Sequence, residues 1–255
     1  MKVVILAGGR GTRIREVSGD KPKPMVEIGG RPIIWHIMAS YARFGFKEFI
    51  VCLGYKGHLI TDYFQNYRVQ NSDLTVDLGS EKISFLNDCE EDWKITLIQT
   101  GLNTMTGGRI KRIASYIEEE NFCLTYGDAL SDVNIKTLVN QHIRSGAKAS
   151  ITAVRPSGRF GLLTLGENNK VTSFSEKPSS EGGWINGGFF VLNKSVIDYI
   201  DGDQTIWERE PLEQLAAENE LRYFLHNDFW QCMDTYRDWE TLNTICQTKS
   251  LPWLV

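Results

Sequence analysis

The sequence predicts an α/β fold with a mixed, mostly parallel, Rossmann-like sheet and an antiparallel elaboration toward the carboxyl terminus. Three observations predict it. The unbroken apolar run from Val3 to Leu6 is typical of a strand buried on both faces. Further short apolar runs alternate with segments of helical periodicity as far as residue 154, which is the pattern of a parallel sheet. After Arg155-Pro156 the signals become those of hairpins.

The first strand is followed by a short strand, a helix, a longer strand and a second helix. Residues 25–28 form the short strand, which Gly29-Gly30 ends, and Pro32 then suits the first turn of a helix. Apolar residues at three- and four-residue spacing continue that helix to Ala42. The next strand covers 48–53, and apolar residues at positions 60, 63, 64 and 67 indicate the helix that follows.

The alternation is interrupted between residues 68 and 93. This segment is polar and acidic, with brief alternation of apolar residues that favours a hairpin, and the sequence assigns no chemistry to it. The regular order then resumes. We expect a strand at 94–99, a helix through 110–117, a strand at 122–125, a helix at 134–145 and a strand at 149–154.

The second half carries shorter elements. They are a hairpin of 162–165 and 171–174, a strand at 188–192, a helix at 211–218, a strand at 222–225, an extended segment at 229–234 and a closing helix at 237–248. No repeat, low-complexity tract or linker separates the halves. We therefore expect one domain over 1–255, in which the halves, about 1–154 and 155–255, share a single mixed sheet.

Bulk properties exclude several classes of protein. A net charge of −4 argues against nucleic-acid binding, which requires a basic surface. No apolar run approaches the ~20 residues of a membrane span, and the apolar residues after Met1 end too early for a signal peptide. The five cysteines are scattered and lack C-x-x-C spacing, so neither a zinc site nor a disulfide framework is expected. We expect a cytoplasmic protein.

The loop after the first strand carries the strongest chemical signal. It contains three glycines between residues 8 and 11, and such a turn at the carboxyl end of a parallel strand favours anion binding. The loop is surrounded by cations, and in an acidic chain this excess indicates a polyphosphate ligand; they are Arg10, Arg13, Arg15, Lys21 and Lys23. The Walker A pattern fails because arginine stands at position 13, and the dinucleotide fingerprint fails because isoleucine stands at position 14.

Two aspartates are candidate metal ligands. Asp128 follows the strand at 122–125, and Asp234 follows the aromatic and apolar run at 229–233, so both are expected where α/β sheets hold their ligands. Two carboxylates suit Mg²⁺, which keeps substrate phosphate oxygens among its ligands. The alternative is that either aspartate caps a helix, and Asp234-Thr235 is also a good helix start.

Polar residues in the second half suit a sugar phosphate. Glu176 and Asn186 match sugar hydroxyls, Lys177 offers a charge for phosphate, and Gly187-Gly188 would let a sugar ring approach the backbone. For the Glu-Lys-Pro tripeptide alone, an exposed charged turn is the simpler interpretation.

Together these motifs resemble the signature G-G-x-G-T-R…K-P-K of the sugar-1-phosphate nucleotidyltransferases. Nearly the whole chain is similar to the glucose-1-phosphate cytidylyltransferases of that family. The matching blocks are KPKPMVEIGGRPIIWHIM (21–38), TGGR (106–109), TYGD (125–128), RFG (159–161), EKP (176–178), INGGFFVLN (185–193), MDT (233–235) and the terminal Pro252-Trp253. The resemblance implies a three-layer αβα nucleotidyltransferase fold.

The resemblance also implies a reaction and a set of roles. The substrates would be CTP and α-D-glucose 1-phosphate, the products CDP-glucose and pyrophosphate, the cofactor Mg²⁺, and the assembly a homo-oligomer that supplies deoxysugar and surface polysaccharide synthesis. Catalysis would fall to Arg13 and Lys23. The first half would bind the nucleotide through Leu6, Ala7, Gly8, Gly9, Arg10, Gly11, Thr12, Arg13, Lys23, Thr106, Arg109 and Gly127. The second half would bind the sugar phosphate through Glu176, Lys177, Asn186 and Gly187. The metal would be held by Asp128 and Asp234.

Two positions depart from the family pattern. Ala129 stands where glycine is usual after the metal aspartate, and Cys232 stands where proline is usual. Both are small changes beside the metal ligands, so they bear on fine geometry or substrate preference and not on the reaction. Apart from them, two alternatives are open. One is the same chemistry with UTP, dTTP or another sugar-like phosphate. The other is a nucleotide-sugar sensor without turnover, which would not require Arg13, Lys23, Asp128 and Asp234 together.

Overall fold

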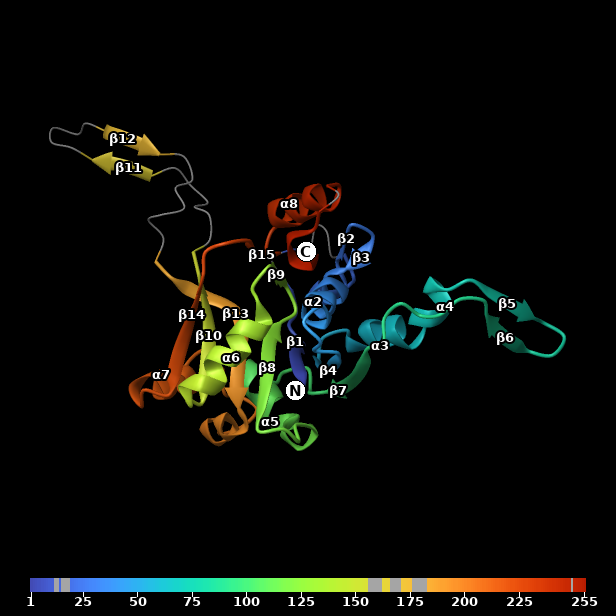
Figure 1. The fold of residues 1–255 in the computed structure, drawn as a ribbon, viewed down its shortest axis with the longest axis horizontal. Helices are drawn as coiled ribbons and strands as arrows, with labels where there is room; N and C mark the ends of the chain where they lie inside the picture. Colours follow the sequence, from blue (N-terminus) through green and yellow to red (C-terminus); the bar gives the residue numbers. More distant parts are fainter. Residues whose placement is uncertain (12–13, 15–18, 156–161, 166–170, 176–182, 249) are drawn as a thin grey trace.

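The computed structural model describes residues 1–255 except 12–13, 15–18, 156–161, 166–170, 176–182 and 249, and the backbone alone at 162–165 and 171–175. Its centre is a seven-stranded sheet in the order β14-β10-β13-β8-β1-β4-β7 (Figure 1). The strands are β1 (Val3–Ala7), β4 (Glu48–Leu53), β7 (Lys94–Gln99), β8 (Asn121–Tyr126), β10 (Ala149–Val154), β13 (Ile185–Asn193) and β14 (Leu221–His226). β13 is antiparallel to both of its neighbours, and the other neighbouring pairs are parallel. The predicted mixed, mostly parallel sheet is confirmed.

Both halves of the chain contribute to this sheet. β13 lies between β8 and β10, and β14 forms one edge. The antiparallel elements of the second half are β13, the pair β11 (Leu162–Leu165) with β12 (Val171–Ser175), and β15 (Trp230–Cys232), which pairs with β9 (Ala129–Ser131). β14 instead runs parallel to β10, and the chain passes from β13 through η4 (Lys194–Tyr199) and α7 (Glu210–Ala217) before it re-enters the sheet.

Helices cover both faces of the sheet. Side chains alternate along a strand, so Val3 and Ile5 face one way while Val4 and Leu6 face the other. The first pair joins a buried cluster with α2 (Ile33–Ala42), α6 (Ile135–Ser145) and α8 (Tyr236–Cys246). The second pair joins a cluster with α5 (Thr106–Arg112), η4 and α7. The fold therefore has the three layers that the resemblance implied.

The predicted strands at 48–53, 94–99 and 149–154 have the observed bounds. The predicted strand at 25–28 is shorter: η2 (Lys23–Met25) is a 3-10 turn with proline in its first turn, and only β2 (Glu27–Ile28) pairs, with β3 (Arg31–Pro32). The predicted helix at 110–117 also ends early, at Arg112. The 3-10 turn η3 (Ala114–Tyr116) follows it and keeps Ile117 buried. A last 3-10 turn, η5 (Pro252–Leu254), buries Trp253.

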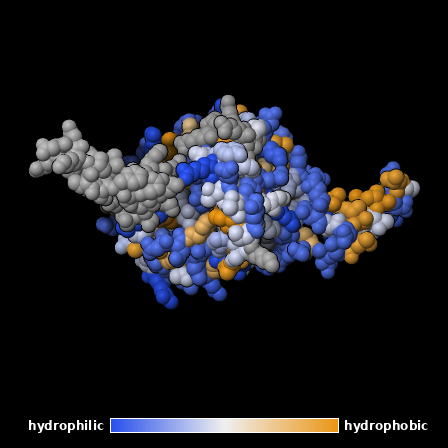
Figure 2. Space-filling model, turned by 90° about the horizontal axis from the view of Figure 1, so that it is seen from above, coloured by the Kyte–Doolittle hydropathy of each residue, from blue (hydrophilic) through white to orange (hydrophobic). Residues whose placement is uncertain are grey.

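The segment between 68 and 93 contains the hairpin that the sequence indicated. α3 (Gly57–Gln65) and α4 (Tyr67–Asn71) lead to β5 (Leu74–Asp77) and β6 (Lys82–Phe85), which extend away from the sheet (Figure 1). Val76 pairs with Ile83 across this hairpin, and both are exposed. In Figure 2 the arm that projects from the molecule carries many hydrophobic residues on its surface. No helix within the described ranges is long and apolar enough to cross a bilayer.

Candidate active site

A cavity of about 470 Å³ lies at the carboxyl ends of β1 and β8, which is a typical size for a small-molecule site. Parallel strands end at the same edge of a sheet, so the loops after β1 and β8 meet there. The start of α5 and the segment before α8 complete the walls. The lining residues are Leu6, Ala7, Gly8, Gly9, Gly11, Ile14, Lys23, Pro24, Thr104, Met105, Thr106, Arg109, Tyr126, Gly127, Asp128 and Asp234.

Two glycines of the loop after β1 are required by close approaches. A Cβ at Gly8 would lie 2.1 Å from Nη1 of Arg109, so only glycine leaves room for the guanidinium. Gly11 has a φ of +58°, and a Cβ there would lie 3.0 Å from Cβ of Lys23. The glycines therefore let the loop pack against two of the cavity's cations.

Arg109 is held by backbone carbonyls and a hydroxyl. Its Nη1 donates to the carbonyl of Leu53 at 3.0 Å, to Oγ1 of Thr100 at 2.7 Å and to the carbonyl of Gly101 at 2.9 Å. Its Nη2 donates to the carbonyl of Gly8 at 3.2 Å. The residue is only 5% exposed, and this burial lowers the pKa of its guanidinium. Arg109 thus places a fixed positive charge in the cavity lining, in contact with the glycine loop.

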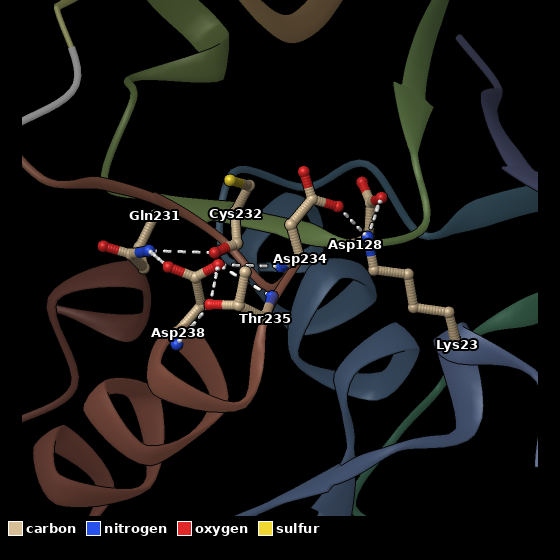
Figure 3. A network of polar contacts seen from close by, with 7 residues as sticks. All are labelled: Lys23, Asp128, Gln231, Cys232, Asp234, Thr235 and Asp238. Atoms are coloured by element: carbon tan, nitrogen blue, oxygen red, sulfur yellow. Dashed lines mark hydrogen bonds and ion pairs between the residues drawn. The ribbon is translucent and has the colours of Figure 1, made fainter. Parts of the chain in front are cut away.

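Lys23 joins the two predicted metal ligands (Figure 3). Its Nζ lies 2.7 Å from Oδ2 of Asp128 and 2.5 Å from Oδ1 of Asp234. Burial is the largest influence on the pKa of Lys23 and lowers it, but the two carboxylates together outweigh burial, so the pKa lies above its ordinary value. One cation therefore sits between two carboxylates that come from distant parts of the sequence.

The pairing of β9 with β15 brings the two aspartates together. Met233, which precedes Asp234, donates its N–H to the carbonyl of Asp128 at 2.8 Å. The departures from the family pattern are direct neighbours in this ladder, because Ala129 pairs with Cys232. Both unusual residues are therefore part of the structure that sets the distance between Asp128 and Asp234.

Asp234 does not cap α8. Thr235 is the N-cap, and its hydroxyl and the carboxylate of Asp238 form a capping box. The same carboxylate accepts the N–H of Asp234 at 3.0 Å (Figure 3). The helix cap thus fixes the backbone of Asp234, while the side chain of Asp234 faces Lys23. The alternative that this aspartate serves only as a helix cap is therefore wrong.

A polar chain links α5 to β13 through a residue that the sequence did not single out. Glu208 accepts the hydroxyl of Thr106 at 2.6 Å through Oε2 and the hydroxyl of Tyr126 at 2.6 Å through Oε1. Nδ2 of Asn186 donates to the Tyr126 hydroxyl at 3.1 Å. Burial, and next the charge of Glu208, raise the pKa of Tyr126, so its hydroxyl keeps its proton. Tyr126 adjoins Gly127-Asp128 and could have been suspected for that reason; nothing in the sequence pointed to Glu208.

The structure brings most of the expected nucleotide residues to one cavity. Those that line it are Leu6, Ala7, Gly8, Gly9, Gly11, Lys23, Thr106, Arg109 and Gly127, with Asp128 and Asp234 beside them. Arg10 is exposed and donates to Oδ1 of Asn103 at 3.3 Å, so it lies outside the lining. Asn186 reaches the cavity through Tyr126, and the Gly187 carbonyl accepts from Trp230. Four expected residues lie outside the described part of the chain: Thr12, Arg13, Glu176 and Lys177.

Comparisons with known proteins identify the family of the chain. A family model described as nucleotidyl transferase matches residues 2–240. The glucose-1-phosphate cytidylyltransferases of Salmonella typhi and Salmonella typhimurium are each 50% identical to the chain over 254 residues, which cover 99% of this chain and 98% of theirs. The crystal structure of HddC from Yersinia pseudotuberculosis complexed with GMP-PN superposes with a TM-score of 0.67 at 27% identity, covering 95% of this chain and 98% of that one. The chain therefore belongs to the nucleotidyl transferase family, in the group of the glucose-1-phosphate cytidylyltransferases.

Proposed function

We propose that this protein transfers the cytidylyl group of CTP to α-D-glucose 1-phosphate, giving CDP-glucose and pyrophosphate. The observation that carries the proposal is the meeting of Lys23, Asp128 and Asp234 beside the glycine loop, in a chain half identical to the Salmonella cytidylyltransferases. This arrangement offers a cation and two metal-binding carboxylates to a polyphosphate. A purely binding protein would not need all three.

The reaction itself requires positioning and charge stabilisation. A phosphate oxygen of the sugar phosphate attacks the α-phosphorus in line, the new P–O bond forms, and the bond to the β-phosphate breaks to release pyrophosphate. No covalent enzyme intermediate is needed. The chain's part is to hold the two substrates in line and to neutralise charge as it builds up on the α-phosphate.

Lys23 is the residue best placed to neutralise that charge. It lies between Pro22 and Pro24, whose fixed φ stiffens the backbone. Its side chain is 12% exposed, so its charge is only partly screened by water. Arg13 remains a second candidate from the family signature.

Asp128 and Asp234 would hold Mg²⁺. Their fit to a cation is supported by the Lys23 ammonium, which already contacts both carboxylates. When bound, the ion supplies further positive charge for the triphosphate. Oxygen ligands from one or two carboxylates are what Mg²⁺ takes in proteins that bind nucleotides.

The base is expected to lie against the glycine loop and Arg109. Cytosine presents an acceptor at N3 where uracil presents a donor, and a guanidinium is a donor only. Arg109 uses Nη1 on three acceptors and Nη2 on the Gly8 carbonyl, so it can favour cytosine directly or by fixing the loop backbone. Asn186, with Glu176, Lys177 and Gly187, would hold the sugar phosphate.

The test is pyrophosphate release with a panel of nucleoside triphosphates against a panel of sugar 1-phosphates. The expected result is fastest release with CTP and glucose 1-phosphate in the presence of Mg²⁺. Equal use of CTP and UTP would overturn the cytidylyl assignment. Binding of CTP without release of pyrophosphate would identify a sensor instead.

A further inference from the structure

The carboxylate of Glu208 contacts two walls of the cavity. Oε2 accepts from Thr106 at the start of α5, and Oε1 accepts from Tyr126 at the end of β8. α5 also carries Arg109, and β8 leads directly to Asp128. The Glu208 carboxylate therefore joins the two walls at the side chains of Thr106 and Tyr126.

Neither hydroxyl has a proton left for a ligand. A hydroxyl has one proton, and in each case that proton is donated to Glu208. The Thr106 oxygen also accepts the N–H of Trp207 at 2.9 Å, and the Tyr126 oxygen accepts from Asn186 at 3.1 Å. Thr106 and Tyr126 are thus oriented by the protein and can offer a ligand only acceptor capacity or apolar surface.

The loop that carries Glu208 is itself fixed to the core and to α5. Trp207 is fully buried and makes an edge contact with Phe190, whose ring also contacts Tyr126. A Cβ at Gly108 would lie 2.6 Å from Cα of Asp203, so this loop packs directly on the helix backbone. Glu208 is therefore held independently of any ligand.

We propose that Glu208 is a positioning residue that aligns the nucleotide side of the cavity with its sugar-phosphate side, acting through Thr106 on one side and through Tyr126 and Asn186 on the other. This role rests on the proposed function, because in-line attack requires two substrates at a fixed angle. Displacement of a substrate by 1 Å can cost ~10²-fold in rate.

Glu208→Gln tests the role with almost no change of shape. A carboxylate can accept two hydroxyls, whereas an amide has one acceptor oxygen and an NH₂ that would meet a hydroxyl already used by its neighbours. We expect kcat to fall roughly 10-fold or more, the scale of one lost hydrogen bond to a charged acceptor. Glu210→Gln, an exposed glutamate two residues further on, is the matched control and should behave like the parent.

Two double-variant cycles show whether Glu208 acts through its partners. Thr106→Val removes one bond and should change the KM for the triphosphate, while Tyr126→Phe should change the KM for the sugar phosphate. The double variant Thr106→Val with Glu208→Gln should have the same triphosphate KM as Thr106→Val alone. The double variant Tyr126→Phe with Glu208→Gln should have the same sugar-phosphate KM as Tyr126→Phe alone. Fully additive effects in both cycles would overturn the proposal.

A structural role alone predicts a different result. In that case Glu208→Gln would lower Tm while kcat and both KM values stayed at the parent level, and the proposal would be wrong. The substrates for these measurements are whichever pair the parent turns over fastest in the panel. A parent that uses another triphosphate therefore refutes the proposed function without deciding the role of Glu208.

Discussion

The two ends of the cavity hold their positive charges in opposite ways. At one end Arg109 is 5% exposed and bound to neutral oxygens of the backbone and of Thr100. At the other end Lys23 is bound to two carboxylates whose side chains are 32% and 28% exposed. Arg109 therefore carries an unbalanced positive charge before any ligand arrives, whereas the described trio of Lys23, Asp128 and Asp234 has a net charge of −1.

This difference indicates which end must rearrange. Neutral oxygens leave the charge of Arg109 unbalanced, so an anionic nucleotide can approach that end without breaking an ion pair. The carboxylates of Asp128 and Asp234 do compete with a phosphate for Lys23. A divalent cation on the carboxylates would relieve this competition, so metal and lysine are expected to oppose each other in the absence of nucleotide.

The largest expected effect comes from the carboxylate end. Asp234→Asn removes one of the two charges available to the metal and should lower kcat by ~10²–10³-fold, the scale of one lost electrostatic contact in a transition state. The fold should persist, because the backbone of Asp234 is held by Asp238 and Thr235 caps the helix. Steady-state pyrophosphate release across a Mg²⁺ titration measures the effect.

Asp228→Asn, an exposed aspartate near the same strand, is the control for Asp234→Asn and should keep parent activity. Turnover of the Asp234 variant at the parent rate, at low Mg²⁺, would remove this aspartate from the metal site. Restoration of its rate only at high Mg²⁺ would support the site.

Lys23→Met should separate catalysis from metal binding. We expect kcat to fall ~10²-fold with a smaller change in KM, because the charge is needed most as the α-phosphate becomes more negative. The same change removes a cation from between two carboxylates, so Mn²⁺ should bind the nucleotide-free protein roughly 10-fold more tightly. Mn²⁺ titration followed by electron paramagnetic resonance measures the affinity.

Lys21→Met is the matched control for Lys23→Met, since Lys21 is exposed and pairs with Glu27 at 2.7 Å. It should leave Mn²⁺ affinity unchanged. If Lys23→Met bound Mn²⁺ no more tightly than the parent, the two ends of the cavity would not differ in the way described. A change confined to the KM for CTP would exclude the transition-state role.

The sequence predicted the strands and the charged residues of the cavity better than the contacts that join them, which are the β9–β15 ladder and the hydrogen bonds of Glu208. Apolar runs bounded by turn residues located β4, β7 and β10, and a strand-end position located Asp128. The β9–β15 ladder has three residues on each strand, too few for a periodic signal, and it pairs segments about 100 residues apart. Glu208 lies 102 residues from Thr106 and 82 from Tyr126, and its role follows from packing that no local pattern records.

The smallest expected effect is at the arginine end, and it concerns choice of base. The parent should prefer CTP to UTP by at least ~10-fold in kcat/KM, because the wrong base would leave buried polar groups facing like groups, at ~1–3 kcal/mol each. Arg109→Ala should lose part of this preference. It should also lower the free energy of unfolding by about 1–3 kcal/mol, since the Gly101 carbonyl loses its donor, whereas the Gly8 carbonyl keeps the N–H of Tyr55.

Arg112→Ala, on the same helix but exposed and paired with Asp203, is the control. Urea unfolding and kcat/KM for both triphosphates measure the two effects. Full discrimination by a destabilised Arg109→Ala protein would show that the loop backbone reads the base without the guanidinium, and the arginine end would then be a structural wall alone.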